Sequence, residues 1–154
     1  MDTAQVRVDF NRLGRSNAGL VFAGLCVQVG EACFPDREWT DFVVVVLSWW
    51  ADAFEQLLRG DRSRVQARFM EGPFLMEIQN AGTGFWLMQL VEEGLERRVR
   101  GEKVIPIVPL VSSCADVCES VLDACRDHEW WSSDAHALST AAAKLSEALK
   151  CLVS

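Results

Sequence analysis

Residues 40–60 read TDFVVVVLSWWADAFEQLLRG, and this stretch decides the fold of the chain. Its polar residues recur at steps of three and four, which places them on one stripe of an α-helix. They are Ser48, Asp52, Glu55, Gln56 and Arg59. Thr40 or Asp41 is expected to cap the N-terminus by accepting a hydrogen bond from a free backbone N–H. Gly60 is expected to end the helix in the left-handed conformation, so the sequence predicts one helix over residues 40–60.

The opposite side of this helix is apolar and is predicted to be buried. Its residues are Phe42, Val45, Val46, Trp49, Ala53, Phe54 and Leu57. The run 43–46 taken alone favours a strand, because β-branched residues prefer strands, but the capped length and the continuing periodicity favour a helix. A helix this apolar must lie across a sheet. Since Trp49 is expected inside, its replacement by alanine is expected to cost about 3–5 kcal/mol of stability.

The composition bounds the class of protein. The chain has 154 residues, which fits one domain spanning residues 1–154, and half of them are hydrophobic, so a core can form without disulfides or metal ions. The formal net charge of −7 argues against a nucleic-acid partner, because such a partner needs a basic surface. The same charge is compatible with a basic protein partner.

Three further observations predict a cytoplasmic protein. The start, MDTAQVRVDF, lacks the charged and then apolar pattern of a secretory signal. No apolar run approaches the roughly 20 residues of a membrane helix, so we expect no membrane association. Six cysteines without a secretory signal indicate reduced thiols in a reducing compartment.

The remaining elements follow from periodicity and turn residues. Strands are predicted near residues 6–10, 20–29, 65–70, 74–79, 85–91 and 104–108, with Pro106 marking the last one as an edge strand. Helices are predicted from Ser112 or Ser113 to about Asp127, and from Ser133 or Asp134 to about Leu152. This order predicts an α+β fold: a mainly antiparallel sheet of about five or six strands, with one long helix packed on it and two C-terminal helices.

The cysteines do not match a metal site. Cys114, Cys118 and Cys125 share one face of a predicted helix. A zinc site brings close Cys or His pairs from two segments, whereas this chain has two histidines and no CxxC motif. A buried cysteine packs well as a small apolar residue, so these thiols are predicted to be structural. Cys26, Cys33 and Cys151 lack a neighbouring histidine in sequence that would mark a nucleophile.

No other pattern indicates catalysis or a cofactor. His128 and His136, paired with Asp127 or Asp134, could form an acid–base site, but a polar loop between helices is the favoured interpretation. The segment AGTGF at residues 81–85 lacks the lysine and the following helix of a phosphate loop, so it is predicted to be a hairpin turn. We therefore predict no enzyme, no catalytic residue, no metal and no cofactor.

The surface pattern of the C-terminal region is more informative. Between residues 114 and 135 there are six carboxylates and one guanidinium, a local excess of five negative charges. Tryptophans lie at the end of this segment, and aromatic anchors beside steering carboxylates are typical of a surface that binds a basic protein. The predicted partner-binding residues are Asp116, Glu119, Asp123, Asp127, Trp130 and Trp131. The alternatives are a solvated helix face, with tryptophans that fill the space beside the sheet, or a binding surface around Arg68, Glu71 and Glu77 with the 36–38 loop.

Residues 39–58 (WTDFVVVVLSWWADAFEQLL), with RFMEGPF at 68–74 and SVLDACRDHEW at 120–130, carry a resemblance. They resemble small uncharacterised bacterial proteins, some of which look like immunity proteins encoded beside secreted toxins. The resemblance covers most of the chain and includes no catalytic or ligand-binding motif. It implies a cytosolic protein that binds one toxin and blocks it, and it transfers no functional residue.

The sequence thus favours a non-enzymatic immunity protein or antitoxin that covers the active site of a basic toxin domain. A secretion chaperone or adaptor is the alternative, and such a protein would form a dimer with exposed apolar grooves. A small enzyme with a pocket between sheet and helices is the third class. The neighbouring gene would separate them, since a toxin, a secreted effector and a metabolic enzyme indicate three different roles.

The structural interpretation of the cysteines predicts that the purified protein carries no stoichiometric zinc. Elemental analysis measures this directly. One metal atom per chain that disappears when Cys114, Cys118 or Cys125 is replaced by serine would contradict the prediction.

Overall fold

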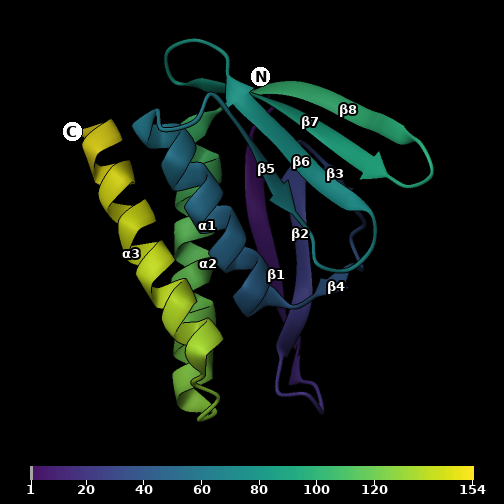
Figure 1. The fold of residues 1–154 in the computed structure, drawn as a ribbon, viewed down its shortest axis with the longest axis vertical. Coiled ribbons are helices and arrows are strands. Elements are labelled where there is room, and N and C mark those ends of the chain that lie inside the picture. Colours follow the sequence, from purple (N-terminus) through teal and green to yellow (C-terminus); the bar gives the residue numbers. More distant parts are fainter. Residues whose placement is uncertain (1) are drawn as a thin grey trace.

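The computed structural model of the protein describes residues 2–154 and contains eight strands and three helices (Figure 1). The strands are β1 (Ala4–Arg15), β2 (Val21–Val29), β3 (Ala32–Phe34), β4 (Thr40–Asp41), β5 (Arg64–Arg68), β6 (Phe74–Asn80), β7 (Phe85–Glu93) and β8 (Arg97–Pro106). The helices are α1 (Val43–Arg59), α2 (Ile107–Asp127) and α3 (Ser133–Val153). The predicted α+β class is confirmed.

The strands form two antiparallel sheets of four strands each, so the prediction of one sheet is wrong. The first sheet has the order β1-β2-β3, with β4 also paired to β2, and the second has the order β5-β6-β7-β8. Every pairing joins strands on the same side of α1 in the chain. Strands close in sequence pair most readily, and α1 separates the two groups, so each group closes a sheet of its own.

The three helices gather on one side of the molecule and the two sheets on the other (Figure 1). Helix α1 contacts β2 and β5, one strand from each sheet, while α2 packs against β1, and α3 lies against α1 and α2. One hydrophobic cluster includes buried residues from both sheets and all three helices. Helix α1 therefore lies at the centre of the core.

Helix α1 ends where the sequence predicted and begins two to three residues later. Gly60 adopts a φ of 77° in the left-handed region, which confirms it as the C-cap. The N-cap residue is Phe42, whose side chain makes no capping hydrogen bond. The predicted caps, Thr40 and Asp41, belong to β4. The Asp41 carboxylate instead accepts the backbone N–H of Phe42 at 2.8 Å.

The buried face of α1 is centred on Trp50, and the prediction that Trp49 lies inside is wrong. Trp50 is fully buried and donates its indole N–H to the carbonyl of Arg68 at 2.7 Å. Trp49 is 44% exposed, and Val45 is only half-buried. Trp50 lies four residues before the buried Phe54, whereas Trp49 lies three residues before the exposed Asp52, so the two rings face different surroundings.

The two C-terminal helices also begin earlier than expected. Helix α2 starts at Ile107 directly after β8, and Pro109 lies in its first turn, where a missing N–H breaks no helical hydrogen bond. Ser113, expected as a cap, accepts the backbone N–H of Val6 in β1 at 2.8 Å and donates to the carbonyl of Leu110. Helix α3 is capped by Ser132, whose hydroxyl accepts the N–H of Ala135.

A buried carboxylate and an aromatic cluster join the two sheets. Asp41 is 1% exposed, and its carboxylate accepts the Trp39 indole N–H at 3.0 Å and the backbone N–H of Glu71, in the turn between β5 and β6, at 3.3 Å. Trp39 also packs edge-to-face on Phe69 and Phe74 beside the second sheet, at 6.3 and 5.2 Å between ring centroids.

The burial of α1 predicts opposite outcomes for its two tryptophans. Trp50→Ala removes a fully buried side chain and its hydrogen bond, so unfolding in urea should show a loss of about 3–5 kcal/mol. Trp49→Ala is the matched control and should cost less than about 1 kcal/mol, because its ring is half in solvent. Equal losses for the two variants would show that the helix is rotated from its position here.

Candidate functional site

The predicted acidic residues lie together on the exposed side of α2. Asp116, Glu119, Asp123 and Asp127, named here the acidic stripe, are all exposed. They follow one another at steps of three and four along about 16 Å of helix. The buried side of the same helix is formed by apolar residues and thiols, among them Cys114, Cys118, Val121, Leu122 and Cys125. The periodicity of α2 therefore turns every carboxylate of the stripe to solvent.

Most of the charge on the acidic stripe is uncompensated. Asp123 pairs with Arg126 at 3.0 Å, and both side chains are more than half exposed. The other three carboxylates form no ion pair within residues 2–154. Uncompensated charges of one sign on a rigid helix attract a partner of the opposite sign and speed its encounter.

The two tryptophans after α2 occupy different environments. Trp131 is 44% exposed, and the Arg126 guanidinium lies 4.9 Å from the centre of its ring. Trp130 is half-buried against the core and stacks on His128 with ring centroids 4.3 Å apart. The structure thus brings Asp123, Arg126 and Trp131 together, while Trp130 supports the loop from inside.

The histidines do not assemble an acid–base site in the part of the chain described. His128 stacks on a ring, and His136 is exposed on α3. Neither pairs with a carboxylate within 4.0 Å among residues 2–154. Their positions agree with a polar turn between two helices.

The thiols are unpaired, and several are strongly shielded. Cys114, Cys118 and Cys125 are buried and reduced, as predicted. A hydrogen bond with Cys118, together with burial, raises the pKa of the Cys114 thiol, and burial raises the pKa of Cys125. A thiol that stays protonated at neutral pH is a weak nucleophile and a weak metal ligand. Residues 2–154 contain no group of three or more Cys, His, Asp or Glu side chains placed to hold a metal ion.

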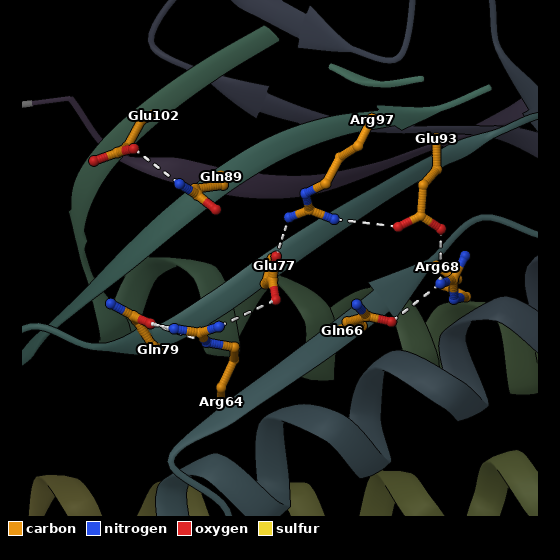
Figure 2. A network of polar contacts seen from close by, with 9 residues as sticks. All are labelled: Arg64, Gln66, Arg68, Glu77, Gln79, Gln89, Glu93, Arg97 and Glu102. Carbon is orange, nitrogen blue, oxygen red and sulfur yellow. Dashed lines mark hydrogen bonds and ion pairs between the residues drawn. The ribbon is translucent and has the colours of Figure 1, made fainter. Parts of the chain in front are cut away.

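A second polar surface covers the solvent side of the second sheet (Figure 2). Nine side chains, named here the sheet face, form it: Arg64, Gln66, Arg68, Glu77, Gln79, Gln89, Glu93, Arg97 and Glu102. Arg97 bridges Glu77 and Glu93, and Glu93 also pairs with Arg68 at 3.1 Å. Arg64 completes the array through Glu77 at 3.7 Å.

Strand register produces this array. Gln66 faces Glu77, Glu77 faces Gln89, and Gln89 faces Glu102, so one row of polar side chains crosses all four strands. Leu75 and Val91 point to the same side as this row and are nonetheless fully buried. The three arginines and three glutamates of the sheet face balance, so this surface carries no net charge.

The alternative surface predicted from sequence divides between this array and a loop. Arg68 and Glu77 belong to the sheet face, while Glu71 is exposed in the adjoining turn. The loop before β4 is held by Arg12, whose guanidinium donates to the carbonyl of Glu38 at 2.6 Å and to the Thr40 hydroxyl at 2.8 Å. The structure does not merge these parts into one charged patch.

Sequence analysis missed an exposed aromatic side chain on α1. Trp49 lies between two surface hollows, one of about 340 Å³ against α3 and one of about 250 Å³ against β5. The second hollow reaches Gln66, at the margin of the sheet face. The polar neighbours Ser48 and Asp52 were the signal that Trp49 belongs to the outer stripe.

No protein-family model, no curated protein and no solved structure matches this chain. Within residues 2–154 no helix combines the length and the apolar composition that a membrane-spanning segment needs.

The sheet face predicts an uneven response to loss of its carboxylates. Glu77→Gln removes the charge that two guanidiniums share at a largely shielded position, so it should cost about 1–2 kcal/mol in urea unfolding. Glu102→Gln removes a charge that accepts only one side-chain amide N–H. Its free energy of unfolding should therefore stay within about 0.5 kcal/mol of that of the unsubstituted protein. Equal small losses would mean that the network adds nothing beyond ordinary surface pairs.

Proposed function

We propose that this chain is a non-enzymatic binding protein of the immunity or antitoxin type, which blocks a basic toxin domain in the cytoplasm. The observation that carries the proposal is the acidic stripe of α2, whose unpaired carboxylates lead to the exposed ring of Trp131. The sheet face has more residues, but its three arginines pair with Glu77 and Glu93 and its formal charges sum to zero. The acidic stripe is therefore the surface that best fits a basic partner.

The proposed mechanism is steric. Carboxylates of the stripe would draw in the basic groups with which a toxin holds its own substrate, and would then occupy their place. Trp131 supplies a large apolar ring that desolvates on contact, which is the usual chemistry of an interface hot spot. The Arg126 guanidinium lies against one side of this ring, at 4.9 Å from its centre.

The resemblance to toxin-immunity proteins supports the same function. A chaperone role would instead require a dimer with an apolar groove at its surface, and an enzyme would require converging reactive groups. Size-exclusion chromatography and the identity of the neighbouring gene separate these alternatives from the proposal.

The proposal predicts that charge and ring act on different rate constants. The double variant Asp116→Lys with Glu119→Lys should slow association with the toxin domain encoded beside this gene by about tenfold at low salt. It should also weaken the salt dependence of that rate. Trp131→Ala should mainly speed dissociation and cost about 2 kcal/mol of binding free energy.

Glu71→Lys is the matched control, because Glu71 is an exposed carboxylate far from α2 in the chain. Stopped-flow or surface-binding kinetics on folded variants gives both rates. Unchanged rates for the α2 variants, with a loss in Glu71→Lys, would remove the acidic stripe as the interface. Tight binding with no effect of any of these variants would do the same.

A further inference from the structure

A basic hollow lies on the outer face of the first sheet, away from the core. Its volume is about 290 Å³, and its lining includes Arg7, Arg12, Arg37, Cys26 and Cys33. Asp9 is the one carboxylate in the lining, in a protein whose formal net charge is −7. The hollow therefore concentrates positive charge on an otherwise acidic molecule.

Strand register brings these residues together from three segments. Arg7 of β1 is the direct partner of Cys26 in β2, and Gln28 of β2 is the partner of Cys33 in β3. Because side chains alternate along a strand, these four point to the same face. The neighbouring Val6 and Val27 point inward and are buried in the core. Arg37, from the loop after β3, closes the outer side of the hollow.

Arg12 forms one wall of the hollow, and hydrogen bonds hold its side chain in place. Arg12 is fixed by hydrogen bonds to Asp9, to the carbonyls of Glu38 and Trp39, and to Thr40. Its guanidinium lies over Gly24, where a Cβ atom would come within 2.3 Å of the Arg12 Nη2 atom. Because Gly24 has no Cβ atom, the Arg12 guanidinium has room to lie against the strand at this position.

The other two guanidiniums are largely uncommitted. The Arg7 side chain makes no hydrogen bond or ion pair within residues 2–154, and the Arg37 side chain donates only to the backbone carbonyl of Glu31 at 3.3 Å. By contrast, the arginines of the sheet face bind carboxylates. Glu31, Asp36 and Glu38 lie near Arg37 in sequence but do not line the hollow. Most donors of Arg7 and Arg37 thus remain available to a ligand.

The floor of the hollow does not neutralise these charges. Burial and the adjacent Cys33 thiol raise the pKa of Cys26 to about 12, although Arg7 and Arg37 act in the opposite direction. Cys26 is therefore an uncharged thiol at neutral pH.

We propose that this hollow is a binding site for a small molecule that carries an oxyanion, either a phosphate or a carboxylate. The guanidinium fork matches both groups through paired N–H donors. The volume lies near the lower end of the roughly 300–1,000 Å³ of ligand pockets, which suits a compact ligand. The site is independent of the proposed function, since none of the residues that line it belongs to α2. A ligand-free surface on which these arginines are only solvated is the competing interpretation.

The test measures binding of inorganic phosphate to the full chain, with succinate as the carboxylate probe. Titration with one of the two probes should change the amide chemical shifts of β1, β2 and β3, and these changes should saturate. Arg7→Gln and Arg37→Gln should each weaken that binding at least about tenfold. Arg7→Lys should be intermediate, because it keeps the charge and loses the fork. Arg15→Gln, which removes an exposed arginine of the same strand, is the matched control and should bind normally.

A second readout uses the half-buried Cys33 thiol as a reporter. In a Cys151→Ser background, which removes the exposed cysteine, the bound anion should slow alkylation of Cys33 by neutral iodoacetamide. Peptide mapping by mass spectrometry identifies the modified residue. Circular dichroism confirms that each variant is folded.

Several outcomes would overturn the proposal. Shifts that do not saturate, or that respond equally to Arg7→Gln and Arg15→Gln, would show an adventitious ion only. Saturable binding that survives both Arg7→Gln and Arg37→Gln would place the anion elsewhere on the molecule. Loss of phosphate binding with unchanged toxin binding, or the reverse, separates this site from the acidic stripe.

Discussion

The buried carboxylate of Asp41 is the interaction on which the arrangement of the molecule depends. It accepts N–H groups from the indole of Trp39, from Phe42 at the start of α1, and from Glu71 between β5 and β6. These donors lie in the loop before β4, at the N-cap of the central helix and in a turn of the second sheet. A buried carboxylate is tolerated only where hydrogen bonds replace its water, and here they do so with groups from all three units.

The orientation of α1 follows from this anchor. Once its first residue is fixed, the Trp50 indole meets the carbonyl at the end of β5, and the opposite side carries Trp49 and the polar stripe to solvent. Helix α1 then offers a surface against which α3 packs, and α3 closes over α2.

Features that depend on local periodicity were predictable from sequence. Gly60 ends α1, Gly72 and Gly84 adopt positive φ in hairpin turns, and the carboxylates of α2 face solvent because the thiols between them face inward. Features that depend on register or on distant partners were not predictable. Nothing local shows that Asp41 serves a turn thirty residues away rather than a helix cap.

The candidate sites differ in the same way, because one depends on local spacing and two depend on strand pairing. The acidic stripe lies on a single helix, so its spacing alone revealed it. The sheet face and the basic hollow each combine residues from three or more strands or loops. Arg7 is unremarkable in sequence until pairing of β1 with β2 sets it beside Cys26.

The hydrogen bond between Ser113 and the N–H of Val6 also bears on how this chain avoids aggregation with other copies of itself. An edge strand with free amide groups can template a strand from another molecule, which leads to aggregation. On β1 one of these groups is occupied by a helix side chain, and α2 packs along the strand. Strand β5 is shielded by α1, while β3 and β4 are only three and two residues long. Within residues 2–154 that leaves β8 as the long open edge, where a break in register and mostly basic side chains disfavour recruitment of a foreign strand.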